Sequence, residues 1–529
     1  MKCLELCSSP VPQVEPSCPL EEARQLLSLS RADALIVAQG EEFWGLLSRY
    51  TLDHALRFGL EGTAGDFAQP DTPCVEGETE ACPEVLLHLL QNPLHKAVIR
   101  QKGKVVGLLS TEDLFREGLP PLRPKVFTPK LPPLLREMVE VVYDLSKKLG
   151  VRSYLVGGTI RDLLLNRPFY DVDLVVGQKV EEFVREFGRL FRARCVKRSP
   201  FQTFKFQYED WEIDIAQARW EYYVSPGALP QTAPGPFEAD LFRRDFTINA
   251  MALSLARPNF GRLIDPLGGQ QDLEKKCLRV HHLLSFVDDP TRLFRAARYM
   301  SRFALQPSPG TQKAKDLALN LGVLENLSGA RLRNEWLRLL EEERPAEALS
   351  YLAQMGVLEA LAPGANQALG ALSYVAQQDL PPETRLETLA LILGSLQGNL
   401  QEKLLSSPKQ ARRFREAWEE LRRSVSFLTQ KRPLSEKVFF LEKFPEAVLL
   451  LLAAQEPPLR PLIEQAFREY FRLRPRLTGK KLQEKGLPPG PKLGEMLKRL
   501  RAARLDGLVE TEEDEWALLK KEYPDVFLA

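Results

Sequence analysis

The sequence has no long apolar run and almost no net charge. No stretch approaches the about 18 consecutive apolar residues that a membrane-spanning helix needs, so we expect no contact with a membrane. The N-terminal residues MKCLELCSSP lack a basic segment followed by an apolar one, so we expect no secretion signal and a cytoplasmic protein. With 72 Lys and Arg against 71 Asp and Glu, the formal net charge is +1. Any affinity for nucleic acid must therefore come from local basic patches.

The cysteines and histidines are few and form no metal-ligand pattern. The seven cysteines are odd in number and contain no C-x-x-C pair, so we expect a reduced protein without a disulfide framework. Of the five histidines only His281 and His282 are adjacent, and we expect this pair in a turn or on the surface. A zinc site and a histidine general base are therefore both disfavoured.

The length and composition are those of a multidomain globular protein. The 529 residues are 44% hydrophobic and 27% charged, and a chain of this length has room for about three or four domains. Leu119–Leu134 holds six prolines in sixteen residues, which predicts a stiff, extended linker. A helical pattern follows at Leu134–Leu149.

Ahead of the linker the chain contains a weak internal repeat. Gly-Leu-Leu-Ser occurs at 45–48 and again at 107–110, 62 residues later. In the first copy a helix-like stretch at 20–29 and an apolar run at 34–37 come before this string. In the second copy the corresponding stretches are 83–91 and 97–100. The pattern predicts two copies of a helix-strand-strand-helix unit.

The most informative stretch is Tyr154–Val176, YLVGGTIRDLLLNRPFYDVDLVV. Its pattern predicts a strand, a tight turn at Gly157-Gly158, a helix, a loop and a second strand. A glycine pair can adopt positive φ and lets a phosphate approach the backbone closely. In the second strand Asp171 and Asp173 project from one face. Two neighbouring carboxylates repel each other, and they are stable where they bind a divalent metal or share a proton.

The string GG-x-x-R-D-x-L-L followed by D-x-D resembles the signature of the DNA polymerase β-type nucleotidyltransferases. It is most similar to class II tRNA nucleotidyltransferases and bacterial poly(A) polymerases, and the resemblance covers roughly residues 135–364. It implies that Asp171 and Asp173 are catalytic and hold two Mg²⁺ ions. It also implies that the triphosphate and ribose of an incoming nucleotide are positioned by Gly158, Arg161 and Arg244.

Two later strings extend the resemblance. LFRRDFTINAMAL at 241–253 matches the family string R-R-D-F-T-x-N-A-M-A, and it supplies Arg244. DDPTRLFRAARY at 288–299 matches a Glu-Asp-x-x-Arg string, with Asp288 in place of the usual glutamate. The family likeness implies that the Watson–Crick edge of the base is read by Asp289 and Arg292, and that the pocket is supported by Arg295 and Arg298.

The residues themselves leave a simpler interpretation of Asp289 open. Pro290 suits the first turn of a helix, which makes Asp289 a natural N-cap.

A second alternative concerns Asp214. The alternating run Trp211–Ile215 places Glu212 and Asp214 on one face of a strand, where Asp214 is either a third acidic group at the metal site or part of a solvated face. The Pro- and Gly-rich segment Ala218–Asp240 predicts an irregular loop.

The tail contains a local basic patch. From Arg460 to Arg504 there are thirteen Lys and Arg against four Asp and Glu. A Gly- and Pro-rich turn at the start of a basic helix favours a phosphate backbone, whereas a solvated charged face is the alternative. The family resemblance implies RNA contacts here, for which the candidates are Lys480, Lys481 and Lys492.

The expected fold class is multidomain α+β, with a mixed-sheet nucleotidyltransferase head and an all-α neck, body and tail. The repeat in the first part resembles a pair of CBS modules, and this implies an adenine nucleotide near Ser110–Asp113, where a Ser-x-x-Asp pattern can hold a ribose. The expected domains are a CBS-like pair at 1–118, a linker at 119–134, a head at 135–275, a neck with the base-reading helix at 276–365, and the body and tail at 366–529.

The resemblance implies template-independent addition of the 3′-terminal A, or of the whole CCA end, to tRNA from ATP and CTP with Mg²⁺. A poly(A) polymerase is one alternative. A nucleotide-regulated RNA-binding protein with an inert transferase fold is another. The intact Asp171-x-Asp173 pair argues against the second alternative, because an inert fold has no need of both carboxylates.

Overall fold

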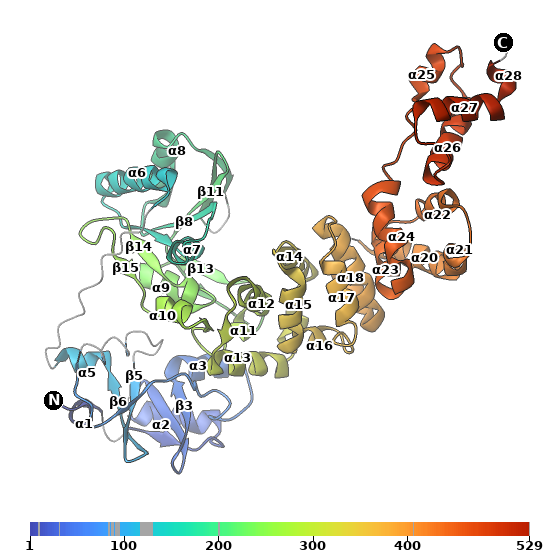
Figure 1. The fold of residues 1–529 in the computed structure, drawn as a ribbon. Helices are drawn as coiled ribbons and strands as arrows, with labels where there is room; N and C mark the ends of the chain where they lie inside the picture. Colours follow the sequence, from blue (N-terminus) through green and yellow to red (C-terminus); the bar gives the residue numbers. More distant parts are fainter. Residues whose placement is uncertain are drawn as a thin grey trace. The chain divides into compact units, whose positions relative to one another are not determined.

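The computed structural model describes residues 1–8, 11–30, 32–82, 85, 89, 96–116, 131–198, 202–405 and 407–527. They form two compact units, residues 1–327 and residues 328–529. The first unit combines sheets and helices, and the second is helical (Figure 1). Most of the helix expected at 83–91 and nearly all of the linker expected at 119–134 lie outside the described residues.

The first 116 residues, here called the N-terminal module, contain the predicted repeat. Each copy is a three-stranded sheet in which a parallel pair is followed by an antiparallel hairpin, with a register shift after Val37 in one copy and after Ile99 in the other. The strands are β1 (Gln13–Val14), β2 (Ala34–Gln39), β3 (Glu42–Ser48), β4 (Cys74–Glu76), β5 (Lys96–Gln101) and β6 (Lys104–Ser110). The helices are α1 (Cys3–Leu6), α2 (Leu20–Ser30), α3 (Arg49–Arg57) and α5 (Thr111–Arg116).

A seven-stranded mixed sheet forms the centre of the head. Its strand order is β15-β14-β7-β8-β11-β10-β9, and only β8 and β11 run parallel. The strands are β7 (Ser153–Val156), β8 (Asp171–Val176), β9 (Arg194–Arg198), β10 (Thr203–Tyr208), β11 (Trp211–Gln217), β14 (Ala252–Ser254) and β15 (Leu263–Ile264). The nearby helices are α6 (Pro133–Leu149), α7 (Gly158–Leu164) and α8 (Val180–Leu190).

The segment expected to be an irregular loop contains regular structure, so that prediction is wrong for most of its length. Arg219–Tyr222 (β12) and Gln231–Pro234 (β13) form an antiparallel hairpin, and Phe237–Phe242 (α9) follows. The four residues of β12 alternate between half-buried and exposed, as a strand at a surface does. Pro226, Gly227 and Pro230 lie in the turn, where Gly227 has φ +71°, whereas Pro234 ends β13 and is followed by Gly235 and Pro236.

The last part of the first unit is residues 276–327, here called the neck segment. Its main helices are α11 (Ser285–Asp288), α12 (Thr291–Phe303) and α13 (Pro309–Asn320), with the parallel bridge of β16 (Cys277–Leu278) to β17 (Gln306–Pro307). Helix α10 (Gly269–Glu274) precedes it, and short 3₁₀ turns occur at Thr247–Asn249 and Val323–Asn326. His281 and His282 are expected in a turn or on the surface. They lie in a bend, where His281 is buried and the His282 side chain is 18% exposed.

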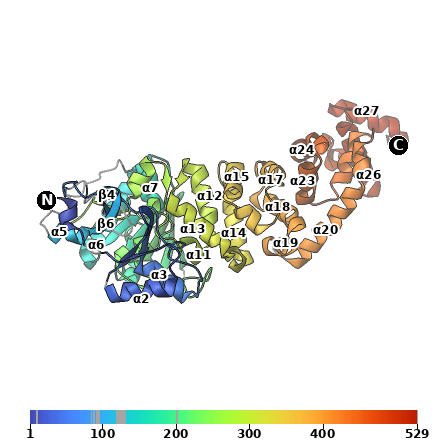
Figure 2. The ribbon, with the colours of Figure 1, turned by 90° about the horizontal axis from the view of Figure 1, so that it is seen from below.

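The second unit contains helices and no strand among its described residues, as expected for an all-α body and tail (Figures 1 and 2). Residues 447–454 of α23 are buried all round and form a core segment. The helices are α14 (Gly329–Leu340), α15 (Pro345–Gln354), α16 (Val357–Leu361), α17 (Leu369–Ala376), α18 (Pro382–Leu396), α19 (Gly398–Leu404), α20 (Pro408–Arg423), α21 (Val425–Thr429), α22 (Leu434–Leu441), α23 (Glu446–Gln455), α24 (Arg460–Gln465), α25 (Gly479–Glu484), α26 (Pro491–Leu505), α27 (Glu512–Glu522) and α28 (Pro524–Phe527).

Two expectations about composition can be compared with the structure. None of the helices in the described ranges is long and apolar enough to cross a membrane. All seven cysteines are free thiols, as their odd number and spacing predict.

One buried carboxylate organises the tail and can be tested. Glu515 is fully buried and accepts hydrogen bonds from the backbone N–H groups of Arg476 (3.0 Å) and Leu477 (2.7 Å). We expect Glu515→Ala to lower the free energy of unfolding of the tail by about 3 kcal/mol, because two buried donors lose their acceptor. Thermal unfolding and amide hydrogen exchange at residues 476 and 477 measure this. The exposed Glu513→Ala is the control, and equal stability of the two variants would contradict the role of Glu515.

Candidate active site

The parallel pairing of β8 with β11 collects carboxylates on one face of the head sheet. In this register Asp171 lies opposite Glu212, and Asp173 lies opposite Asp214. Asp171 is exposed and Asp173 is half-buried. The register therefore brings together the pair expected to bind metal and places Asp214 directly beside it.

The charges on this face are only partly balanced. Burial raises the pKa of Asp173, and the nearby Asp171 adds to the rise while Arg244 opposes it. Burial, with Asp173 and Glu212 as neighbours, raises the pKa of Asp214 to about 6.

One carboxylate oxygen of Asp214 is left without a hydrogen-bond partner among the described residues. Its Oδ1 is buried and has no hydrogen-bond partner within the described part of the chain. Its Oδ2 is 3.9 Å from Lys205 Nζ, which bonds more closely to Glu212 Oε2 at 2.5 Å. In the ranges that the structure describes, no group of three or more His, Cys, Asp or Glu side chains could hold a metal ion as it stands, so a bound cation needs water or phosphate oxygens as further ligands.

The glycine turn before α7 lets Arg244 reach the carboxylates. Gly157 has φ +67°, and a Cβ atom there would lie 2.5 Å from Arg244 Nη1 and 3.1 Å from Asp173 Oδ2. Only a glycine fits between these two groups. Arg244 Nη2 also donates to Asp240 Oδ2 (3.1 Å), and Asp240 is fully buried. Thr159 fixes the same turn to β8, because its Oγ1 accepts from Asp173 N at 3.0 Å.

Arg161 is placed differently from a simple phosphate ligand. Its side chain is 5% exposed, and Nη1 donates to Asn249 Oδ1 at 2.6 Å. Its Nε and Nη2 donate to Asp162 at 3.0 and 2.8 Å. The guanidinium also lies 4.6 Å from the ring centre of Phe303. Arg161 thus holds the α7 helix against the segment that carries Asn249.

A second arginine belongs to the same network. Asp245 Oδ1 accepts from Asn249 Nδ2 (2.9 Å), and its Oδ2 accepts from Arg295 Nε (2.6 Å). Although burial opposes its ionisation, Arg295 and Asn249 hold the pKa of Asp245 well below its usual range. Asn249 and Asp245 were not among the expected site residues, although both lie in the string at 241–253. They connect Arg161 to Arg295.

The segment expected to read the base is tightly held. Asp289 Oδ1 accepts from both the N–H (3.0 Å) and the hydroxyl (2.6 Å) of Thr291, so the capping interpretation of Asp289 describes one of its contacts. Arg292 is buried and donates to Ser285 Oγ at 2.7 Å and to the carbonyl of Arg243 at 3.1 Å. Its Nη2 also lies 3.4 Å from the hydroxyl of Tyr223. Arg295 and Arg298 are half-buried on the same helix, α12.

Tyr223 was not expected at this site, yet it connects the hairpin loop to the neck segment. Gly227 N donates to the carbonyl of Val287 (3.0 Å), and Asn326 Nδ2 donates to the carbonyl of Pro226 (3.2 Å). A Cβ atom at Gly227 would lie 2.8 Å from Asn326 Cβ. The loop after β12 is therefore fixed against the start of α12, and the Tyr222-Tyr223 pair is the sequence signal that points to it.

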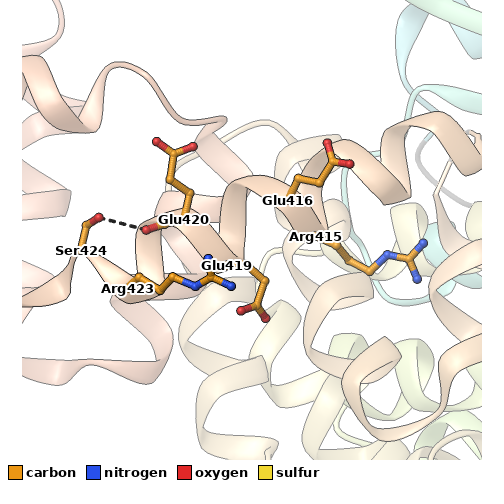
Figure 3. Close-up of a pocket in the computed structure, with 6 residues that line it drawn as sticks. All are labelled: Arg415, Glu416, Glu419, Glu420, Arg423 and Ser424. Atoms are coloured by element: carbon orange, nitrogen blue, oxygen red, sulfur yellow. Dashed lines mark hydrogen bonds between the residues drawn. The ribbon is translucent and has the colours of Figure 1, made fainter.

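The expected RNA-binding lysines lie in the second unit. Lys480 and Lys492 are exposed near the starts of α25 and α26, whereas Lys481 Nζ pairs with Glu512 Oε2 at 2.5 Å. A hollow near these helices is lined by three cationic side chains, Arg474, Lys498 and Arg501, and the last two lie over the ring of Phe439. A second hollow, on α20, has mixed charge (Figure 3) and is lined by Arg415, Glu416, Glu419, Glu420, Arg423 and Ser424.

In the N-terminal module the serine and the aspartate of the Ser-x-x-Asp pattern bond to each other. Asp113 Oδ2 accepts from the N–H (2.8 Å) and the hydroxyl (2.6 Å) of Ser110. In the first copy Ser48 Oγ accepts from Thr51 N at 3.1 Å. Both serines thus begin a helix, and in the second copy the carboxylate expected to hold a ribose bonds to the serine three residues before it.

Comparison with known proteins identifies the class of the head. Residues 153–279 match the family described as "Poly A polymerase head domain", and residues 312–369 match "Probable RNA and SrmB- binding site of polymerase A". The matched head contains the carboxylates of β8 and β11 and the Gly157 turn. The head is therefore that of a polymerase β-type nucleotidyltransferase.

The chain is similar to tRNA enzymes beyond the head. The A-adding tRNA nucleotidyltransferase of Geobacter sulfurreducens is 30% identical over 97% of this chain, which spans 63% of that protein. The A-adding tRNA nucleotidyltransferase of Halalkalibacterium halodurans is 30% identical over 72% of this chain and 90% of its own length. The chain belongs to the class II tRNA nucleotidyltransferase and poly(A) polymerase family, as its motifs predict.

Solved structures agree with this family. The Thermotoga maritima CCA-adding enzyme in complex with tRNA has a TM-score of 0.55 at 26% identity, over 76% of this chain and 98% of that one. Structures of a CCA-adding enzyme with ATP and with CTP have TM-scores of 0.57 and 0.54 at 26% identity, over 74% of this chain and 96% of the other.

The contact between Gly157 and Arg244 gives a first test of the site. We expect Gly157→Ala to lower nucleotide incorporation at least about 100-fold, because the added methyl group displaces Arg244 from Asp173. Gly150→Ala is the matched control, since Gly150 also has φ +67° but nothing lies within 4 Å of its Cβ position. Gly150 lies in the left-handed region with ψ 33°, where an alanine costs about 1–2 kcal/mol, whereas Gly157 has ψ −134°, so the control covers only the positive φ. Equal activity in the two variants would contradict the role assigned to the contact between Gly157 and Arg244.

The raised pKa of Asp214 gives a second test. Its pKa is raised from 3.8 to about 6 in the folded state, so folding favours the protonated carboxyl. The folded protein therefore loses stability as the pH rises from about 3.8 to about 6, and this loss remains at higher pH. We expect Asp214→Asn to raise the melting temperature of the metal-free protein at pH 7.5, and this gain to vanish near pH 4. Mg²⁺ should reduce the gain by stabilising the ionised parent. A gain that is independent of pH would contradict the assignment.

Proposed function

We propose that this chain adds the 3′-terminal A, or the whole CCA end, to tRNA without a nucleic-acid template, using ATP and CTP. The observation that carries the proposal is the carboxylate pair Asp171 and Asp173 with Arg244 beside it across the Gly157 turn. Such a pair next to a cation fits a nucleoside triphosphate with its metal ions. Similarity to A-adding enzymes supports terminal A addition, and similarity to CCA-adding enzymes supports the complete end.

The carboxylate face fits Mg²⁺ as the cofactor. Mg²⁺ commonly takes one or two carboxylates and completes its shell with water and phosphate oxygens. Asp171 and Asp173 would be its ligands, and Asp214 would be a third group near it, since its Oδ1 is buried without a partner. When bound, the metal lowers the pKa of the attacking 3′-hydroxyl and neutralises charge on the departing pyrophosphate.

The chain's own residues position the nucleotide. Arg244, held by Asp240, presents its guanidinium beside Asp173, where a phosphate would be bound bidentately. Gly158 lets the triphosphate approach the backbone, since it carries no side chain of its own. Arg161 acts indirectly, through its bond to Asn249. We therefore propose that Arg161 positions the triphosphate through Asn249 and does not contact it directly.

Base selection is proposed for the turn between α11 and α12. Asp289 and Arg292 would read the Watson–Crick edge of the base, as the family resemblance implies. Arg292 is fixed by Ser285 and Tyr223, which gives it one orientation before the nucleotide binds. Arg295 and Arg298 lie on the same helix and supply positive charge around the pocket.

Two further parts of the proposal concern partners. The exposed Lys480 and Lys492, with Lys481 beside them, would contact the tRNA backbone electrostatically. The repeated sheets of the N-terminal module support a CBS-like pair. An adenine nucleotide there would have to displace Ser110 from Asp113, because that carboxylate bonds to the serine.

Three tRNA transcripts test the function. One lacks CCA, one ends in C and one ends in CC, and each is offered CTP, ATP or both with Mg²⁺. Addition of A only to the CC-ended transcript identifies terminal A addition, and completion of all three identifies a full CCA activity. We expect Asp171→Ala to abolish incorporation without unfolding the protein, because Asp171 is exposed. Long A tails on any transcript would identify a poly(A) polymerase, and no incorporation by the parent would contradict the proposal.

A further inference from the structure

The N-terminal module is bonded to the neck segment by a side chain that caps a helix of the neck. Asp71, 4% exposed, accepts from Ser308 Oγ (2.6 Å) and from Gly310 N (3.0 Å) at the start of α13. A carboxylate is favourable at this position, because the first N–H groups of a helix have no partner within it. A Cβ atom at Gly310 would lie 2.5 Å from Asp71 Oδ2, so the residue must be small.

A lysine on the same helix adds a second connection. Lys313 Nζ donates to the carbonyls of Gly65 (2.5 Å) and Ala68 (2.7 Å) in the N-terminal module. Burial lowers the pKa of Lys313 to about 8, as expected for an ammonium group that is largely removed from water. Two independent polar contacts therefore fix residues 65–71 against α13.

A third contact reaches the turn before α12. His54 on α3 places its Nε2 3.1 Å from Asp288 Oδ1, and His282 Nε2 lies 3.7 Å from Asp288 Oδ2. The imidazole of His54 packs against the carboxylate without hydrogen-bond geometry, because neither His54 Nε2 nor Asp288 Oδ1 has a hydrogen-bond partner among the described residues. The side chains of His54 and Asp288 are 5% and 3% exposed. Burial, together with the nearby Arg292, holds the pKa of His282 well below its usual value. One carboxylate of the neck segment is thus enclosed between two imidazoles, of which one belongs to the N-terminal module.

Asp288 and Asp289 are consecutive, and their side chains have different partners. Asp289 bonds to Thr291 and fixes the start of α12, whereas Asp288 faces the two histidines. The backbone between them leaves the helical conformation, with Asp289 at φ −136° and ψ 95°. The Asp288 side chain is therefore attached to the same turn that carries Asp289 and leads into Arg292.

We propose that His54 is a positioning residue for nucleotide selection, so that the N-terminal module forms part of the wall that orients the base-reading turn. The inference rests on the proposed function, because it needs Asp289 and Arg292 to contact the incoming base. His54 itself does not touch the nucleotide. It acts through Asp288, and it thereby makes the selection of ATP over CTP depend on a residue more than two hundred positions before the turn.

The test compares nucleotide binding by full-length variants in Mg²⁺, with calorimetry for ATP and for CTP. We expect His54→Ala to weaken ATP binding about tenfold and to lower the ratio of ATP to CTP affinity, because the buried Asp288 carboxylate loses the imidazole packed against it. His54→Gln, which keeps a side-chain N–H donor, should recover most of both. Asp53→Ala, at an exposed position on the same helix, is the matched control and should bind as the parent does.

A double-mutant cycle distinguishes positioning from general damage. If His54 acts through Asp288, then His54→Ala should add little to the loss caused by Asp288→Asn, whereas independent effects would add. Folded His54→Ala protein with parental ATP affinity and parental selectivity would overturn the inference, and so would full additivity in the cycle. A parent that binds neither ATP nor CTP would instead overturn the proposed function. If His54→Ala fails to fold, His54→Gln and Asp288→Asn complete the same comparison.

Discussion

The parallel, in-register pairing of β8 with β11 is the constraint on which the candidate site depends. It sets Asp173 beside Asp214 and Asp171 beside Glu212, which concentrates negative charge on one sheet face. Lys205 from the next strand and Arg244 from across the glycine turn offset part of that charge. The remaining negative charge costs stability in the folded protein and suits a divalent cation, which is the cofactor proposed for this face.

The arginines around this face are held by acids from other parts of the chain. Asp240 holds Arg244, and Asp245 holds Arg295, while Asn249 joins Asp245 to Arg161. Each guanidinium is therefore oriented before any ligand arrives, and reorganisation on binding is small. The string at 241–253 supplies Arg244, Asp245 and Asn249 within six residues, which explains why so compact a motif can connect the glycine turn to α12.

The sequence was sufficient where a local pattern decides the structure. The alternation at Asp171–Val176 predicts β8 with the bounds it has, and the helix expected at Leu134–Leu149 begins one residue earlier. The sequence was insufficient where a residue's contacts come from a distant part of the chain. His281 and His282 were expected in a turn or on the surface, yet His281 is buried. The hydrogen bond of Arg161 to Asn249, 88 residues away, has no local signal in the sequence, and the expected role of Arg161 at the triphosphate stays a prediction. The roles of the site residues and the domain limits remain predictions.

The cap that Asp71 gives to α13 has a consequence for how this architecture can vary. Ser308 caps this helix locally through Thr311 N, but Gly310 N is satisfied by a residue 239 positions earlier. A homologue without the first module would have to supply another acceptor for Gly310 N, or begin that helix differently, and would have to leave Lys313 in water. Loss or gain of the module in evolution should therefore be accompanied by compensating changes at the start of α13, outside the carboxylate face of β8 and β11.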